Sequence, residues 1–260
     1  MNSSTASGCP VRLSRNTRSD GTLPVTIELA VAKTHKYASR ESGDTIEMIE
    51  RPRGGFSTVI ADGQGSGHGA KALSLLVAGR AVSLLNEGVR DGAAARATHD
   101  FLFAHRGGKV SAALDIVSVD LSTRSVLFTR NSEVPMVLVQ DGVAQEVDDS
   151  GGRIGMHHHT RPRVLEFPCH EGLSAVIVTD GVAGAGERKR NERFDLSGTV
   201  AESFALCATT QEIADRILEE AIAFDGGRPG DDMTVLVLHL GPAVEAQPIR
   251  RIFYSIPLRG

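Results

Sequence analysis

The order in which strand-like and helical patterns follow one another constrains this fold more than any single motif. Three runs rich in β-branched residues come first, at residues 24–33, 44–51 and 54–63. Two helical patterns follow directly, at 68–88 and 93–106, before short strand-like runs return. Because strands stand before and after a helix pair without regular βαβ alternation, this order predicts an α+β architecture of packed layers.

The second half of the chain returns to the strand period and adds one helix. The expected strands are residues 110–120, 124–130, 136–140, 143–147, 175–181 and 231–240. Asp141 and Gly142 form a hairpin turn signal, so we expect the four runs between 110 and 147 to be an antiparallel meander. Residues 210–224 are amphipathic and predict a helix.

Length, charge and hydropathy exclude several classes of protein. The 260 residues suit one large domain, and 41% hydrophobic with 23% charged residues is ordinary for a globular chain. A net charge of −4 lacks the basic field of a protein that wraps nucleic acid. The sequence has no apolar run near the roughly 18 to 20 residues of a membrane helix, and its first residues lack the apolar stretch of a secretory signal. We therefore expect a soluble, cytoplasmic protein that binds neither nucleic acid nor membrane.

The patterns divide the chain into a leader, a folded unit and a tail. Residues 1–22 are rich in Ser, Thr, Asn and Arg without apolar periodicity, which predicts a flexible leader. Residues 23–240 carry all the strand and helix patterns, with no linker long enough to divide them. Residues 241–260 are predicted to be a tail whose apolar run IFYSI is suited to an extra strand.

Acidic residues stand where the predicted strands end, each beside Gly or another acid. They are Asp44 in SGD, Asp62 in ADGQGSGHGA, Asp180 in TDG, and Asp231 with Asp232 in GDDMT. If these strands are neighbours, their carboxylates converge on one edge of the core, where like charges need a cation. Carboxylate oxygens with few His or Cys partners favour Mg²⁺ or Mn²⁺ over zinc. Two such ions sharing Asp62 suit hydrolytic chemistry.

The order and spacing of these motifs resemble a known family. GGFSTVIADGQGSGHGAKA, preceded by Asp44 at hairpin distance and followed by TDG and DDMTVLVL, is similar to the metal-dependent serine/threonine phosphatases of type 2C, the PPM family. The resemblance is to their bacterial SpoIIE-like branch and covers residues 24–240. It implies an α/β/β/α sandwich, in which two antiparallel sheets are flanked by helices.

The resemblance also implies roles for individual residues. Two Mn²⁺ or Mg²⁺ ions are expected, with Asp62 bridging them, the Gly63 carbonyl joining one, Asp180 and Asp231 completing a site, and Asp44 acting through second-sphere water. Asp62, Asp180 and Asp231 are the expected catalytic residues. The implied reaction is in-line attack of a metal-bridging hydroxide on phosphoserine or phosphothreonine, without a covalent enzyme intermediate.

Two features of eukaryotic relatives are missing here. Those relatives often have a His directly after the Asp-Gly pair, where this sequence has Gln64, and nothing shows that His68 replaces it. Arg40 lies near Asp44, but its surroundings do not match those of the phosphate-binding arginine of the eukaryotic members. The bacterial branch often lacks both features, so their absence favours that branch.

The resemblance implies a phosphoprotein partner. Members of this branch commonly dephosphorylate antagonists of anti-sigma factors or scaffold proteins of stress signalling. With only a short leader before Leu23, the chain resembles the stand-alone feedback phosphatase of a stress complex. The oligomeric state stays open.

Two alternatives belong to other functional classes. One is a non-catalytic binding module with the phosphatase fold, although retention of the acidic residues argues against a decayed site. The other is a dinucleotide-binding protein, because Gly65, Gly67 and Ala70 satisfy the GxGxxA fingerprint. That second alternative requires further βαβ units, whereas a second helix and a group of strands follow here.

Overall fold

The computed structural model describes residues 25–148, 151–187, 191–243, 250–253 and 255. The predicted leader, residues 1–22, and most of the predicted tail lie outside the described residues. Among the helices that are described, none is long and apolar enough to cross a bilayer.

Two five-stranded sheets form the centre of the molecule. The first sheet has the order β1 (Val25–Thr34), β10 (Met233–Pro242), β9 (Ser174–Val178), β6 (Met136–Gln140), β7 (Val143–Val147). The second has the order β2 (Asp44–Glu50), β3 (Phe56–Gly63), β4 (Ala112–Asp120), β5 (Ser125–Asn131), β8 (Arg163–Pro168). Every described strand pair in both sheets is antiparallel.

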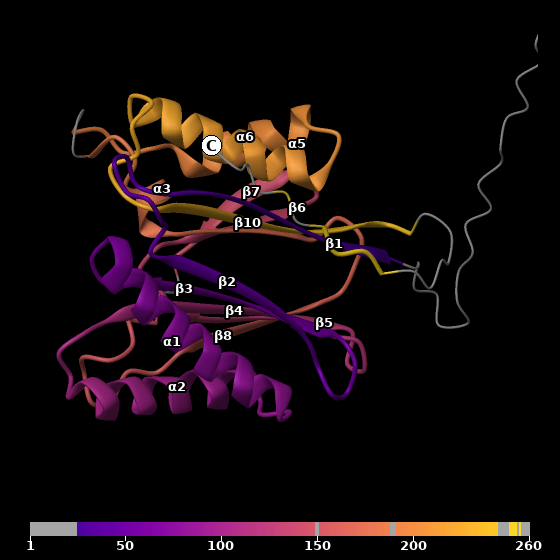
Figure 1. The fold of residues 1–260 in the computed structure, drawn as a ribbon. Helices are drawn as coiled ribbons and strands as arrows, with labels where there is room; N and C mark the ends of the chain where they lie inside the picture. Colours follow the sequence, from indigo (N-terminus) through magenta and orange to yellow (C-terminus); the bar gives the residue numbers. More distant parts are fainter. Residues whose placement is uncertain (1–24, 149–150, 188–190, 244–249, 254, 256–260) are drawn as a thin grey trace, which may run out of the picture.

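Helices cover the outer face of each sheet. The described helices are α1 (Gly67–Asn86), α2 (Asp91–Arg106), α3 (Asp180–Ala183), α5 (Leu196–Leu206) and α6 (Thr210–Phe224). Figure 1 shows α1 and α2 below the second sheet and α5 and α6 above the first, which gives four layers. The predicted α/β/β/α sandwich is confirmed.

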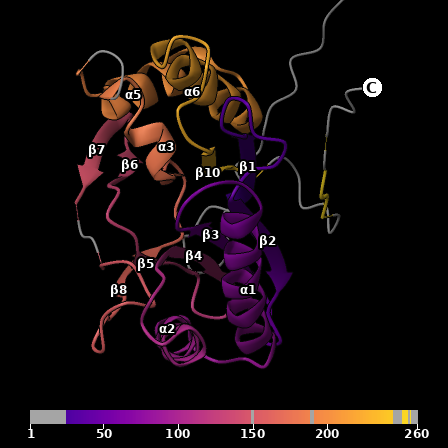
Figure 2. The ribbon, with the colours of Figure 1, turned by 60° about the vertical axis from the view of Figure 1, so that its left-hand side comes forward.

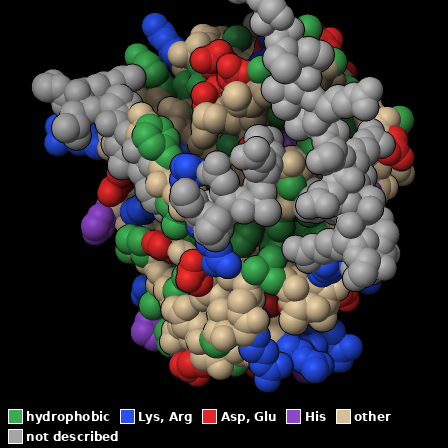
Figure 3. Space-filling view, turned by 90° about the vertical axis from the view of Figure 1, so that its right-hand side faces the viewer, with side chains coloured by type: hydrophobic (Ala, Val, Ile, Leu, Met, Phe, Trp, Pro, Cys, Tyr) green, Lys and Arg blue, Asp and Glu red, His purple; other side chains and the backbone are tan. Residues whose placement is uncertain are grey.

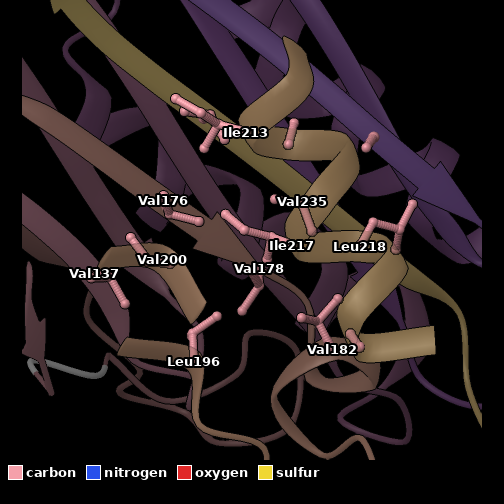
Figure 4. Close-up of a cluster of buried hydrophobic side chains, with 14 of the residues drawn as sticks. Val137, Val176, Val178, Val182, Leu196, Val200, Ile213, Ile217, Leu218 and Val235 are labelled. Atoms are coloured by element: carbon pink, nitrogen blue, oxygen red, sulfur yellow. The ribbon is translucent and has the colours of Figure 1, made fainter. Parts of the chain in front are cut away.

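Three hydrophobic clusters hold the layers together. Between the sheets, the inward faces of β4, β5 and β10 bury Val117, Phe128 and Leu236. Outside the first sheet, Ile213 and Ile217 of α6 pack on valines of β6, β9 and β10, as Figure 4 shows. A third cluster joins α1 and α2 to the second sheet. These strands are buried on both faces, which explains why β9 and β10 read as continuous apolar runs.

The predicted meander is wrong in its connectivity. β4 pairs with β5, but β5 then pairs with β8, while the chain crosses to the first sheet to form the β6–β7 hairpin. Asp141 and Gly142 make the turn of that hairpin as expected, with φ angles of 50° and 78°. The alternation of side chains tells which face of a strand is buried, and it does not tell which sheet the strand joins.

The dinucleotide-binding alternative is also wrong. α1 does follow β3 through the glycine-rich turn, with Ser66 at its N-cap. The described strands on either side of β3 are antiparallel to it, however, whereas the dinucleotide fold builds its crevice from parallel strands joined by βαβ units.

The two ends of the sandwich differ in character. On the end that lies at the right of Figure 1, the space-filling view in Figure 3 shows acidic, basic and hydrophobic side chains interspersed, with basic side chains gathered along the lower edge. The predicted acidic residues belong to the opposite end, which Figure 2 brings forward.

Candidate functional site

Strand geometry places the predicted acids from both sheets at one edge. Asp44 opens β2 and lies opposite Asp62, near the end of β3. Asp180 opens α3 directly after β9, and Asp231 precedes the paired strand β10. Because neighbouring antiparallel strands run in opposite directions, the end of one meets the start of the next at the same edge.

The Asp44 side chain is buried and tied to the other sheet. Its Oδ2 atom accepts hydrogen bonds from Thr179 Oγ1 at 3.0 Å and from Thr234 Oγ1 at 2.6 Å. Its backbone carbonyl accepts from the Nζ atoms of Lys33 and Lys71, each at 2.7 Å. Burial raises the pKa of Asp44 to about 6, although the two threonine hydroxyls oppose this shift. This carboxylate therefore faces protein hydroxyls.

Asp62 and Asp180 both contact the guanidinium of Arg153. Arg153 Nη2 lies 3.1 Å from Asp62 Oδ2, and Nη1 lies 3.4 Å from Asp180 Oδ2. Burial raises the pKa of Asp62 to about 7, with a further contribution from the negative charge of Asp180 and an opposing one from Arg153. Asp62 is therefore a buried carboxylate between one acidic and one basic neighbour.

The adjacent residues Asp231 and Asp232 differ in burial and in hydrogen-bond partners. Asp232 is buried, and its carboxylate accepts from the backbone N–H groups of Lys36 and Gly43, each at 2.8 Å. It fixes the connection between β1 and β2, just before Asp44. Asp231 is partly exposed, and its Oδ1 accepts from the N–H of Asp232 at 3.1 Å.

The glycines that follow Asp62 and Asp180 allow close backbone approach. A Cβ atom at Gly63 would lie 2.3 Å from the Ala70 carbonyl oxygen, and one at Gly181 would lie 2.0 Å from the Asp232 carbonyl oxygen. Neither position tolerates a side chain without moving the backbone. These glycines seat α1 against β3 and α3 against the start of β10.

The donor chemistry of the site suits a hard divalent cation. Within the part of the chain that the structure describes, no three His, Cys, Asp or Glu side chains are arranged as a metal site. Asp62 and Asp180 nevertheless present carboxylate oxygens to one positive group, and burial together with the charge of Asp180 raises the pKa of Asp62. Oxygen donors of this kind fit Mn²⁺ or Mg²⁺.

A cavity of about 50 Å³ opens between the sheets beside Asp62, Arg153 and Asp180. Asp115 lines this cavity and forms a buried pair with Arg130, whose Nε lies 3.5 Å from Asp115 Oδ1. Burial raises the pKa of Asp115 although Arg130 opposes the shift. A volume of this size admits water but not a large organic ligand.

Sequence patterns missed several of these groups. Thr179 and Thr234 are adjacent to or near the predicted acids, so a hydroxyl beside an acidic motif was an available signal. Arg153 is far from Asp62 in sequence, and no local pattern points to it. His68 lies outside the acidic cluster, because its side chain is 92% exposed and contacts Glu41 at 3.3 Å.

Comparison with known proteins decides the family. The profile of the family described as stage II sporulation protein E (SpoIIE) matches residues 52–241. The chain belongs to the SpoIIE family. The stage II sporulation protein E of Priestia megaterium is 25% identical over 214 residues, covering 82% of this chain and 36% of that protein. The stage II sporulation protein E of Bacillus subtilis is 25% identical over 232 residues, covering 88% of this chain and 28% of that protein. The chain therefore spans about a third of the length of these SpoIIE proteins.

Solved structures agree with this family at the level of fold. The PP2C phosphatase domain of B. subtilis SpoIIE, solved with a fragment of its regulatory domain, matches with a TM-score of 0.72 and 24% identity, covering 85% of this chain and 65% of that one. The catalytic domain of PstP with two manganese ions matches with a TM-score of 0.66 and 17% identity, covering 84% of this chain and 100% of that one. RsbX with magnesium matches with a TM-score of 0.63 and 15% identity, covering 84% of this chain and 99% of that one. The family is SpoIIE, as the motifs predict, and the fold is the one solved for these phosphatase structures.

Proposed function

We propose that this SpoIIE-family chain is a metal-dependent phosphatase that hydrolyses phosphoserine or phosphothreonine in proteins. The observation that carries the proposal is the meeting of Asp62, from β3, and Asp180, from the start of α3, around one position of positive charge. A phosphoryl transfer site needs positive charge at such a place, because the reacting phosphoryl group is anionic. The manganese and magnesium ions in PstP and RsbX support the same chemistry.

Each predicted residue then has a task in the proposed site. Two Mn²⁺ or Mg²⁺ ions would be held by Asp62, the Gly63 carbonyl, Asp180 and Asp231. Asp44 would act on them through second-sphere water. When bound, such ions activate water for in-line attack and neutralise charge on the phosphoryl group. The hydroxyls of Thr179 and Thr234 keep the Asp44 carboxylate oriented.

The proposed substrate is a bacterial regulatory phosphoprotein. An antagonist of an anti-sigma factor or a scaffold protein of a stress complex is the class that the resemblance implies, and the fold shared with RsbX supports it. The proposed phosphatase domain is residues 23–240, and the proposed location is the cytoplasm.

Hydrolysis of p-nitrophenyl phosphate by the full chain tests the activity. We expect turnover with Mn²⁺ or Mg²⁺ and none after treatment with a chelator, because the carboxylates alone cannot activate water. Activity that persists without metal would contradict the mechanism. No turnover with any divalent ion, together with no Mn²⁺ binding by calorimetry, would favour the non-catalytic binding module.

Substitution of His68 by Ala is expected to reduce turnover by less than about 10²-fold, below the range for loss of a general acid. The reason is its position, exposed on the first turn of α1 and paired with Glu41. Steady-state kinetics on p-nitrophenyl phosphate at saturating Mn²⁺ measure the effect. A loss of about 10²- to 10⁴-fold would identify His68 as the proton donor instead.

A further inference from the structure

Arg153 contacts two acidic residues of the site, although it lies in none of the acidic motifs. It belongs to the segment between β7 and β8, outside any helix or extended strand. Besides its contacts with the two carboxylates, its Nη2 donates to the backbone carbonyl of Asp62 at 3.3 Å. One guanidinium therefore links the end of β3 to the start of α3.

The backbone on the N-terminal side of Arg153 is fixed by the end of β5. Asn131 Nδ2 donates to the carbonyl oxygens of Gly151 and Gly152, at 2.8 Å and 3.1 Å. A Cβ atom at Gly151 would lie 2.2 Å from the Arg130 carbonyl oxygen, so this approach requires glycine. Asn131 is itself buried, which makes it a rigid anchor.

The C-terminal side is fixed as well. Ile154 exchanges two backbone hydrogen bonds with Ala112, at 2.8 Å and 3.0 Å. The N–H of Gly155 then donates to Nδ1 of the buried His99, at 3.1 Å. Because the backbone is held on both sides, the position of the Arg153 backbone beside the site is imposed by the fold.

The chemistry of this side chain suits two kinds of anion. A guanidinium presents planar donors that match the oxygens of a carboxylate or of a phosphate. A divalent cation bound to Asp62 and Asp180 competes for the oxygens that Arg153 contacts and repels its positive charge. The Arg153 side chain is 22% exposed and the Asp180 side chain 52% exposed, so both groups lie at the open side of the site.

We propose that Arg153 binds two kinds of anion in turn, first carboxylate and then phosphate. In the metal-free chain it neutralises the carboxylates of Asp62 and Asp180, and when divalent cations take those carboxylates it contacts the phosphoryl oxygens of the substrate. The first role concerns the protein alone, and the second rests on the proposed phosphatase function.

Calorimetric titration with Mn²⁺ tests the first role. Arg153→Gln removes the internal competitor, so Mn²⁺ binding should tighten by about 5- to 30-fold, the factor that one or two kcal/mol represents. The matched control is Arg161→Gln, which makes the same change of charge at an exposed position of the same connection and should leave the affinity unchanged. Unchanged or weaker Mn²⁺ binding by folded Arg153→Gln would overturn the competition.

Binding of inorganic phosphate to the Mn²⁺-saturated chain tests the second role. Loss of a charge-assisted contact predicts binding weaker by about 10- to 150-fold in Arg153→Gln, with no change in Arg161→Gln. Unchanged phosphate binding would overturn this role. If the chain hydrolyses no phosphate ester, the proposed function fails, while the Mn²⁺ titration still decides the competition.

Arg153→Lys keeps the experiment decisive if the Gln variant does not fold, as judged by thermal melting in chelator. Lys retains the positive charge and loses the planar fork. Its Mn²⁺ affinity should therefore stay within about threefold of that of the natural chain, while its phosphate binding weakens by about tenfold. Phosphate binding equal to that of the natural chain would contradict the role of the fork.

Discussion

Replacement of Asp62 by Asn is expected to abolish hydrolysis of p-nitrophenyl phosphate, by about 10³-fold or more, while raising the melting temperature of the metal-free protein. Activity falls because the proposed shared ligand loses its charge. Stability rises because Asp62 is a buried carboxylate beside Asp180, and its pKa of about 7 shows that the folded chain holds this charge at a cost.

The pH dependence of the melting temperature separates these two effects. The ordinary pKa of Asp62 is 3.8 and that of the folded chain is about 7, so the folded state binds more protons between these values. The stability of the metal-free natural protein contributed by this group therefore falls as pH rises from about 4 to about 7, and the full cost is present above pH 7. The Asn variant lacks this decline, so its advantage should be larger at pH 8 than at pH 5.

Scanning calorimetry in chelator measures these differences, and each kcal/mol corresponds to roughly 2–4 °C for a chain of this size. Asp141→Asn is the matched control, because it removes the same charge from an exposed hairpin turn where Asn also accepts a positive φ. An Asp62→Asn variant that melts lower than the natural protein at pH 8, or that retains full turnover, would contradict the account of this residue.

The affinity of the metal-free protein for Mn²⁺ is expected to fall by about tenfold for each pH unit below about 7. The cation binds the ionised carboxylate, and a proton competes for Asp62 once the pH drops through its raised pKa. Below about pH 6 the fall should steepen, because burial has also raised the pKa of Asp44 to about 6. An ordinary carboxylate would give a flat profile over this range.

Titration calorimetry at pH 7.5, 6.5 and 5.5 measures this dependence. Proton release on binding should accompany it, greatest near the pKa of Asp62, and is read from buffers with different ionisation enthalpies. Affinity that stays constant between pH 7.5 and 5.5 would show that neither Asp62 nor Asp44 is protonated in competition with the metal.

Much of the fold was predictable, because periodicity and turn residues act locally. The apolar runs, the α1–α2 pair and the Asp141-Gly142 turn lie where the sequence indicates. β8 and α5 were not predicted. β8 is an edge strand with exposed side chains, and α5 contains Gly198, Thr199 and Val200, so neither has a strong local pattern. The assignment of β5 and β6 to different sheets depends on tertiary packing.

The placement of the acidic residues at one edge was predictable for a different reason. Each carboxylate stands at a strand end, where a local motif shows it. The groups that compensate these charges come from elsewhere in the chain: Thr234 reaches Asp44 across the two sheets, and Arg153 reaches Asp62 from a connection with no motif of its own. Long-range electrostatic partners leave no periodic signature in one sequence.

The pairing of β1 with β10 also bears on how this protein is made. Their register runs from Val25 with Pro242 to Thr34 with Met233. The first described strand therefore pairs only after the last one has been synthesised. Contacts between such distant segments form late, after the large entropy loss of closing the chain has been met. Asp44 likewise acquires Thr234 only at that stage. A chain still emerging from the ribosome thus lacks the finished arrangement around Asp44 until β10 is released.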